Sequence, residues 1–256
     1  MEYEEYKKLY DSLNKPDDID RLLECGHDRR LLETLYTQKI SRDVKKRFHY
    51  IRDRSPILLR EWKKGRTLMD ISNKYRFPPI LTAMIIFQED GASKKQFWEF
   101  IKNPEMLESQ QTADEVRDVI RNDLVYSPDA NERHKERGLW GEDLLQNWLN
   151  EQNITYRTEE DLRGGEKRKT PDCLLNEPML YEGKKICWIE SKASFGDNVE
   201  FRYNSRKQFC PYTQLFGPGL VIYWTGCLED LEWPEDVYVS DISVLEKKLT
   251  KIDGGC

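Results

Sequence analysis

The chain has 256 residues, of which 34% are charged and 38% hydrophobic, and its formal net charge is −6. That length predicts one or two domains with a substantial core. No apolar run approaches the ~20 residues of a membrane span, and the opening MEYEEYKKLYD is not a signal peptide. We therefore expect an intracellular protein without a membrane partner, cytoplasmic in a prokaryote and nuclear and cytoplasmic in a eukaryote. Taken alone, the negative charge argues against a nucleic-acid partner.

The first half of the chain is predicted to be helical. N-cap residues, apolar residues at helical spacing and terminal Gly or Pro indicate where each helix begins and ends. Thr67 and Asp70 form a variant of the capping box, and Ser41 is expected to start a helix of its own. The expected helices cover residues 17–25, 28–39, 42–54, 56–64, 67–77 and 80–89.

Residues 66–87 resemble a helix-turn-helix of the resolvase or regulator type, with GRTLMDISNKY as the first helix. The second helix of such a unit should carry polar side chains that reach base edges. Here the second helix is nearly all apolar, with Ile80, Leu81, Ala83, Met84, Ile85, Ile86 and Phe87. Two interpretations stay open, a helix packed in the core and a helix that reads a DNA groove.

Positive charge is concentrated in residues 29–66, the basic segment. It holds thirteen Lys and Arg against four Asp and Glu, a local charge of +9, so the rest of the chain carries −15. Such a cluster, interleaved with aromatic residues, is typical of a surface that contacts phosphates, although a solvated helix face is the alternative. The candidate nucleic-acid-binding residues are Arg42, Lys45, Lys46, Arg47, Arg52, Arg54, Lys63, Lys64 and Arg66.

A looser stretch, residues 109–133, joins two parts of the chain, and Ser127-Pro128-Asp129 predicts a boundary within it. We expect an all-α, helix-turn-helix-like, nucleic-acid-binding region over residues 1–127 and an α/β domain over residues 128–256, so that the whole chain is α+β. The second domain should hold an amphipathic helix at residues 137–151, strands at 154–157, 172–175, 186–190 and 220–224, and a helix near 200–216.

The cysteines and histidines do not predict a zinc site. The six Cys are widely spread without a CxxC pair, and none of the three His lies near a Cys pair. We expect reduced thiols, and any metal site should be built from carboxylates, which suit Mg²⁺ or Mn²⁺.

Two acidic residues and a lysine lie where predicted strands begin and end. Asp172 opens one strand and Glu190 ends another, and the sequence YEGK at residues 181–184 predicts a hairpin turn between them. Side chains alternate along a strand, so Glu190 and Lys192 should share one face, and the hairpin should bring Asp172 across from Glu190. Two carboxylates so close to each other imply a bound cation.

These residues form the P-D…E-x-K pattern and resemble the PD-(D/E)XK nuclease superfamily. Other Pro-Asp pairs lack a strand context, and the similar triplet Glu182-Gly183-Lys184 lies on the predicted turn, where it should face solvent. The superfamily also places an acidic residue on the preceding helix, where Glu142 lies within a GxxGE segment. A salt-bridged hairpin without catalytic function is the alternative.

A closer resemblance lies in the string TPDCLL…WIESKASFGD…QFCPYTQLFGPGLVIYW. It is similar to the C-terminal domain of the codanin-interacting nuclease family, whose archaeal relatives carry the same Thr-Pro-Asp signature. The resemblance covers residues 133–230 well and the helical half loosely. It implies helix-turn-helix-like helices followed by a PD-(D/E)XK nuclease domain with a central mixed sheet. A Gln-x-x-x-Tyr segment maps onto Gln208 and Tyr212, which contact the active site or phosphate, or only pack a helix on the sheet.

The resemblance implies metal-assisted hydrolysis of phosphodiesters. Asp172, Glu190 and the carbonyl of Ser191 would hold Mg²⁺ or Mn²⁺. Lys192 would position the attacking water or stabilise developing charge, and Glu142 would bind a second ion or orient a water. Just beyond, Asp197 is expected to cap the next helix.

The leading hypothesis is a metal-dependent DNA endonuclease, with RNA not excluded. A non-catalytic nucleic-acid-binding or regulatory protein, with the nuclease fold as scaffold, is the alternative. A docking adaptor is a third reading, since animal members of the family bind codanin. A homodimer is expected only because many nucleases of this fold form one.

Overall fold

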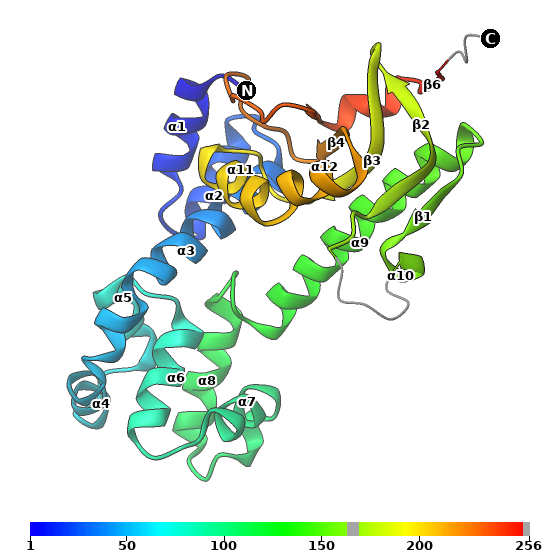
Figure 1. Ribbon diagram of the computed structural model, residues 1–256. Helices are drawn as coiled ribbons and strands as arrows, with labels where there is room; N and C mark the ends of the chain where they lie inside the picture. The colour runs from blue at the N-terminus through cyan, green and yellow to red at the C-terminus, as the bar shows by residue number, and fades with distance from the viewer. Residues whose placement is uncertain (163–168, 253–256) are drawn as a thin grey trace. The chain divides into compact units, whose positions relative to one another are not determined.

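The computed structural model describes residues 1–162 and 169–252. The protein is mixed α+β, with many helices and one mixed six-stranded sheet, which confirms the predicted class (Figure 1). Among the described residues, none of the helices combines the length and the apolar character needed to cross a bilayer. The five described cysteines are free thiols, and Cys256 lies outside the described residues.

The chain divides into two compact units that alternate along the sequence. The sheet unit comprises Met1–Leu13, Arg21–Leu35 and Glu136–Cys256, and the helical unit comprises Asn14–Asp20 and Tyr36–Lys135. A boundary at residues 127 and 128 stays a prediction.

The helical half forms through local signals that the sequence displays. In α5 (Leu68–Tyr75), the Thr67 side chain accepts from the backbone N–H of Asp70, whose side chain accepts in return from the backbone N–H of Thr67, so the predicted capping box is confirmed. The helices of this half are α1 (Tyr3–Ser12), α2 (Asp17–Glu24), α3 (Arg29–Arg52), α4 (Ser55–Lys63), α5, α6 (Pro79–Glu89), α7 (Lys94–Lys102), a 3₁₀ turn (Pro104–Met106) and α8 (Gln110–Asn122).

Helix α6 lies in the core of the helical unit. Every residue from Ile80 to Phe87 is buried, and the surrounding cluster includes Ile51, Leu58 and Ile71. A helix buried on all sides cannot present side chains to base edges. Of the two interpretations of this segment, core packing is therefore the correct one.

Two predictions about this half were wrong. Ser41 does not cap a helix, because α3 runs without a break from Arg29 to Arg52. The stretch at 109–133 is not a loose linker, because α8 forms there with Ser109 as its cap and buries Ala113, Val116 and Val119. At Ser41 a capping residue gives only a weak local preference, and in both cases burial of a helix face outweighs the local signal.

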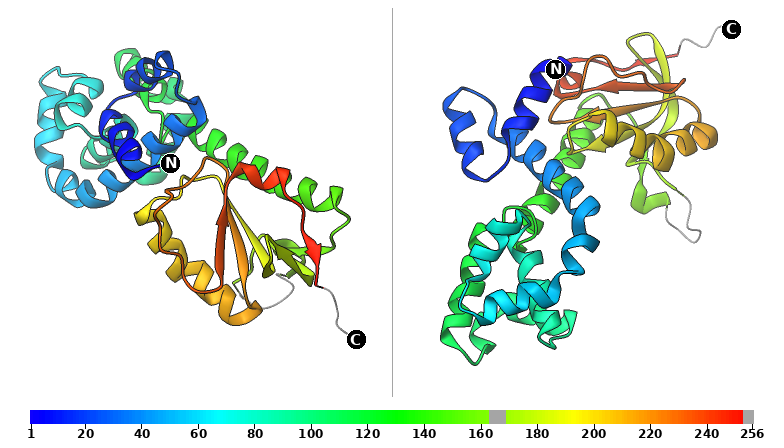
Figure 2. Two further views of the ribbon diagram at one scale, coloured as in Figure 1. Left: turned by 90° about the horizontal axis from the view of Figure 1, so that it is seen from above. Right: turned by 90° about the vertical axis from the view of Figure 1, so that its left-hand side faces the viewer.

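The sheet has the strand order β1-β2-β3-β4-β5, and β6 pairs with β2 (Figure 2). Strands β1, β2 and β3 are antiparallel neighbours, whereas β4 runs parallel to β3 and β5 parallel to β4. The strands are β1 (Tyr156–Thr158), β2 (Cys173–Tyr181), β3 (Lys184–Lys192), β4 (Gly219–Tyr223), β5 (Val237–Ser240) and β6 (Thr250–Lys251). The sequence predicted four of these strands and missed β5 and β6, which are short and partly exposed.

Helices cover the two faces of this sheet (Figure 2). Leu145, Trp148 and Leu149 of α9 (Pro128–Glu151) pack in a cluster with Ile189 and its same-face neighbours. On the other face, a helical segment packs against the core around Trp188. That segment consists of α11 (Asn198–Asn204), a π-helical turn (Ser205–Phe209) and α12 (Cys210–Phe216). Two short helical pieces, α10 (Glu159–Leu162) and a 3₁₀ turn (Ile242–Glu246), complete the unit.

Candidate active site

The β2–β3 hairpin places Asp172 across from Glu190, as the sequence predicted. Its turn has positive φ at Glu182 (49°) and Gly183 (79°), which gives the twist that a two-residue hairpin loop needs. Cys173 pairs with Ile189, so the residues just beyond them meet. The backbone N–H of Asp172 donates to Glu190 Oε2 at 3.2 Å.

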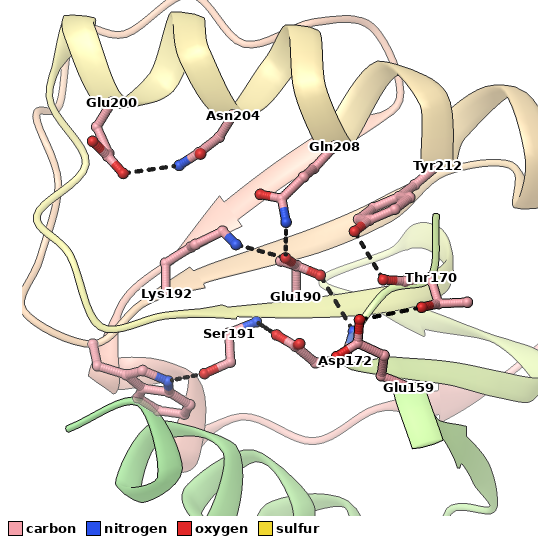
Figure 3. A network of polar contacts seen from close by, with 11 residues as sticks. Glu159, Thr170, Asp172, Glu190, Ser191, Lys192, Glu200, Asn204, Gln208 and Tyr212 are labelled. Carbon is pink, nitrogen blue, oxygen red and sulfur yellow. Dashed lines mark hydrogen bonds and ion pairs between the residues drawn. The ribbon is translucent and has the colours of Figure 1, made fainter. Parts of the chain in front are cut away.

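Glu190 is the centre of a buried polar cluster (Figure 3). It is 2% exposed, and its Oε1 accepts from Lys192 Nζ at 2.6 Å and from Gln208 Nε2 at 3.1 Å. Glu190 and Lys192 therefore share one face of β3, which confirms the alternation expected from the sequence. Gln208 reaches this face from the π-helical turn.

Asp172 is held from the other side by Ser191, whose backbone N–H donates to Asp172 Oδ2 at 2.7 Å. The Ser191 hydroxyl faces the opposite side of the sheet and accepts from Trp224 Nε1 at 2.7 Å. A Cβ on Gly141 of α9 would lie 2.6 Å from the Trp224 ring and 2.9 Å from Ser191 Oγ. Glycine therefore allows α9 to come close to β3, and it places the neighbouring Glu142 beside this end of the strand.

The carboxyl groups disfavour one another's ionisation. Burial, with the charge of Asp172 as the second cause, raises the pKa of Glu190 to about 7. Burial also raises the pKa of Asp172, against the favourable charge of Lys192. Glu142 is solvent-exposed, but desolvation and then the charge of Asp172 raise its pKa. The buried Glu190 and the half-buried Asp172 face one lysine, so the cluster lacks positive charge.

The oxygen donors of this cluster fit a hard cation. Carboxylate and backbone carbonyl oxygens are the ligands that Mg²⁺ and Mn²⁺ prefer, and a cation would relieve the repulsion between Asp172 and Glu190. Over residues 1–162 and 169–252, no group of three or more His, Cys, Asp and Glu is arranged to hold a metal ion. A metal bound here would therefore use two acids together with backbone or water oxygens.

Of the two roles left open for Tyr212, packing of a helix on the sheet is confirmed, and contact with a phosphate stays a prediction. Its ring packs against Trp188 with the centroids 5.3 Å apart, and its hydroxyl donates to the carbonyl of Thr170 at 2.8 Å. It thereby anchors the segment that enters β2 at Asp172. Thr170, whose hydroxyl also lies 3.4 Å from Glu159 Oε1, was not identified from the sequence, although it is part of the Thr-Pro-Asp string.

Asp197 caps α11, as expected. Its Oδ1 accepts from the backbone N–H groups of Val199 and Glu200, each at 3.0 Å, and its Oδ2 accepts from the Tyr6 hydroxyl at 2.6 Å. The contact with Tyr6, which comes from α1, is a long-range one that no local pattern indicates.

The predicted nucleic-acid-binding residues belong to the helical unit, and some of them stabilise its fold. Arg47 donates to the carbonyl oxygens of Tyr75 at 2.6 Å and of Arg76 at 2.9 Å, and Lys63 pairs with Asp90. The nine residues lie on α3, on α4 and next to α4: Arg42, Lys45, Lys46, Arg47, Arg52, Arg54, Lys63, Lys64 and Arg66.

Comparison with known proteins relates the chain to a named group. Residues 108–243 match the family described as "Protein of unknown function TPD sequence-motif". CDAN1-interacting nuclease 1 of Homo sapiens is 36% identical over 172 residues, which cover 64% of this chain and 61% of that protein. The Danio rerio protein of the same name is 32% identical over 192 residues, covering 70% and 64%. The chain thus spans about three fifths of the length of these relatives. No solved structure matches.

Proposed function

Since the chain belongs to the family defined by the TPD sequence motif, with relatives named as nucleases, we propose that it is a metal-dependent nuclease that hydrolyses phosphodiester bonds in DNA. The observation that carries the proposal is the cluster of Asp172, Lys192 and the buried Glu190 at the end of the β2–β3 hairpin. This set corresponds to the P-D…E-x-K pattern of PD-(D/E)XK nucleases. We assign the sheet unit to that superfamily as part of the proposal.

Asp172, Glu190 and the Ser191 carbonyl are the proposed ligands of Mg²⁺ or Mn²⁺, and Glu142 is the proposed contact for a second ion or a ligated water. An ion held by these residues would supply Lewis-acid polarisation of the phosphate and would lower the pKa of its water. Gln208 keeps the Glu190 carboxylate in one orientation through its 3.1 Å hydrogen bond. Ser191 does the same for Asp172 through its backbone N–H.

Lys192 is proposed to act on the reacting groups. Its ammonium lies 2.6 Å from Glu190, and its side chain is largely buried. A cation fixed beside the carboxylates can hold the attacking water or stabilise the charge that develops on the phosphate. In the helical unit, the exposed lysines and arginines of the basic segment are proposed to bind the phosphate backbone of the substrate.

A second candidate function comes from the name of the relatives, which describes them as CDAN1-interacting. A codanin-like protein partner is therefore proposed if the chain comes from an animal. A docking adaptor or regulatory protein that uses the nuclease fold as scaffold would bind its partner without any contribution from Lys192.

The test is a cleavage panel of single-stranded, duplex and branched DNA, with matched RNA, in Mg²⁺ or Mn²⁺. We expect cleavage by the wild-type protein and its loss in Asp172→Ala and Lys192→Ala. The matched control is the similar triplet on the hairpin turn, so Glu182→Ala and Lys184→Ala should cleave as the wild type does. An inactive wild-type protein on every substrate would refute the enzymatic proposal, and so would full activity in Asp172→Ala.

A further inference from the structure

The helical segment that supplies Gln208 has rows of side chains with distinct character. Phe201 and Phe209 are buried and face the core of the sheet unit. A second row consists of Glu200, Asn204, Gln208 and Tyr212, which follow one another at four-residue intervals (Figure 3). Gln208 and Tyr212 reach Glu190 and Thr170, whereas Glu200 and Asn204 pair with each other. Residues four apart share a helix face, so this row forms one polar side of the segment.

The π-helical turn keeps this row aligned with the site. In a regular α-helix, a row with four-residue spacing drifts by about 40° at each step, because four residues turn the chain by about 400°. Within the π-helical turn Ser205–Phe209 the backbone hydrogen bonds span five residues instead of four. For example, the backbone N–H of Cys210 donates to the carbonyl oxygen of Ser205. The turn per residue is smaller there, which offsets the drift between Asn204 and Tyr212.

The next row, on the solvent side, is aromatic and basic. Tyr203 is 60% exposed, and Lys207 follows it four residues later, with Arg202 and Arg206 exposed beyond them. A phenol ring in this position offers a flat apolar surface to a ligand, and three cations lie around it. The only acid of α11, Glu200, belongs to the polar row, where its Oε1 accepts from Asn204 at 3.3 Å.

A further cation links this face to the candidate active site. Lys169 is exposed, and its Nζ donates to the carbonyl oxygen of Lys207 at 2.6 Å. Lys169 also lies three residues before Asp172 in the chain. The basic side chains therefore extend from the outer face of the helical segment to the segment that enters β2.

We propose that this face, Tyr203 with Lys169, Arg206 and Lys207, binds a single-stranded nucleic acid and leads it to Glu190. The cations complement a phosphate backbone, and an exposed aromatic ring stacks on a base. Only an unpaired base has a face available for such stacking, since in a duplex its neighbours cover both faces. This inference rests on the proposed function, since a path towards Glu190 matters only if the carboxylates form the active site. It implies that single strands are the preferred substrate.

The test measures binding without cleavage. Full-length protein in EDTA is titrated into fluorescent oligonucleotides of thymidine, of the corresponding RNA and of duplex DNA, and anisotropy is followed over a range of salt. We expect Tyr203→Ala to weaken single-strand binding about tenfold, and Tyr203→Phe to retain it. Arg206→Gln with Lys207→Gln should lower the slope of log affinity against log salt by about 1.4.

The matched control removes the same charge from another exposed part of the same unit. Lys184→Gln with Lys185→Gln, at the β2–β3 turn, should leave single-strand affinity and salt slope unchanged. The proposal is overturned if the Tyr203→Ala and Arg206/Lys207 variants bind single strands as the wild type does. It is also overturned if they weaken duplex binding as much as single-strand binding.

Failure of this inference is distinguishable from failure of the proposed function. A protein that cleaves DNA but binds single strands independently of Tyr203 keeps the nuclease assignment and loses the inference. A protein that binds single strands through Tyr203 but cleaves nothing keeps the inference and loses the nuclease assignment. The ratio of the affinities for the thymidine oligonucleotide and for the corresponding RNA then decides whether the single strand is DNA or RNA.

Discussion

Lys192 lies on a sheet strand with its ammonium 2.6 Å from a carboxylate that is 2% exposed, whereas Lys46 lies on the exposed side of α3. The first lysine belongs to a small cluster in which every charge has a fixed neighbour. The second is one of thirteen basic residues between positions 29 and 66. A buried charge interacts strongly with the few groups fixed next to it. An exposed charge is screened by solvent, so it acts mainly through its contribution to the total charge of the segment. Single substitutions should therefore have large effects in the cluster and small ones in the basic segment.

The largest expected difference is in catalysis. Glu190→Ala should lower the single-turnover cleavage rate by at least about 10³-fold, since a metal ion supplies several kcal/mol of charge stabilisation. Lys46→Ala together with Lys64→Ala should lower it by less than about tenfold at low salt. Rates measured at saturating protein give this comparison, with Glu182→Ala as the control. Equal losses in the two regions would show that the distinction between them is wrong.

The next effect concerns stability and pH in the absence of metal. The pKa of Glu190 is raised to about 7 in the folded protein, so the folded state binds a proton that the unfolded state has already released. The free energy of unfolding should therefore fall as pH rises from about 4.5 to 7, by about 3 kcal/mol. Urea unfolding in EDTA measures the change.

Two additions sharpen this pH test. Glu190→Gln should remove most of the pH dependence, because the amide does not titrate. Mg²⁺ should stabilise the wild-type protein more at pH 8 than at pH 5, because its ligands must be ionised. Stability that increases from pH 5 to pH 8 in EDTA would contradict the picture of a cluster short of positive charge.

A third effect is a difference in stability between substitutions of two neighbouring residues of the basic segment. Arg47→Ala should destabilise the helical unit by roughly 1–2 kcal/mol, because the carbonyls of Tyr75 and Arg76 lose their donor. Lys46→Ala, one position away and exposed, should change stability by less than about 0.5 kcal/mol. Chemical denaturation of the two variants provides the measurement. Equal stabilities would mean that Arg47 is as peripheral as Lys46.

The smallest expected effect is on binding to duplex DNA. Lys46→Gln with Lys64→Gln should weaken duplex binding modestly at low salt and reduce the salt slope by about 1.8. Anisotropy titrations in EDTA over a range of salt give both quantities. An unchanged slope would place the phosphate contacts on other residues.

Much of the candidate site follows from local rules. The turn at Glu182-Gly183 fixes the register of the hairpin, and the two-residue period of a strand puts Glu190 and Lys192 on one face. Local patterns do not predict the continuity of α3 through Ser41 or the formation of α8, because both depend on helix faces that are buried in the core. The buried face of α8, around Val116, outweighs the polar composition of its segment.

The sequence by itself determined the caps at Thr67 and Asp197, the hairpin and the opposition of Asp172 to Glu190, because each depends on residues close together in the chain. Only the tertiary structure decided that Gln208 donates to Glu190, that Trp224 donates to Ser191 and that α6 lies in the core. It also decided the ionisation of the cluster, which depends on burial by distant elements. Contacts between distant segments follow from how the whole chain packs its apolar surface, and a local pattern does not contain that information.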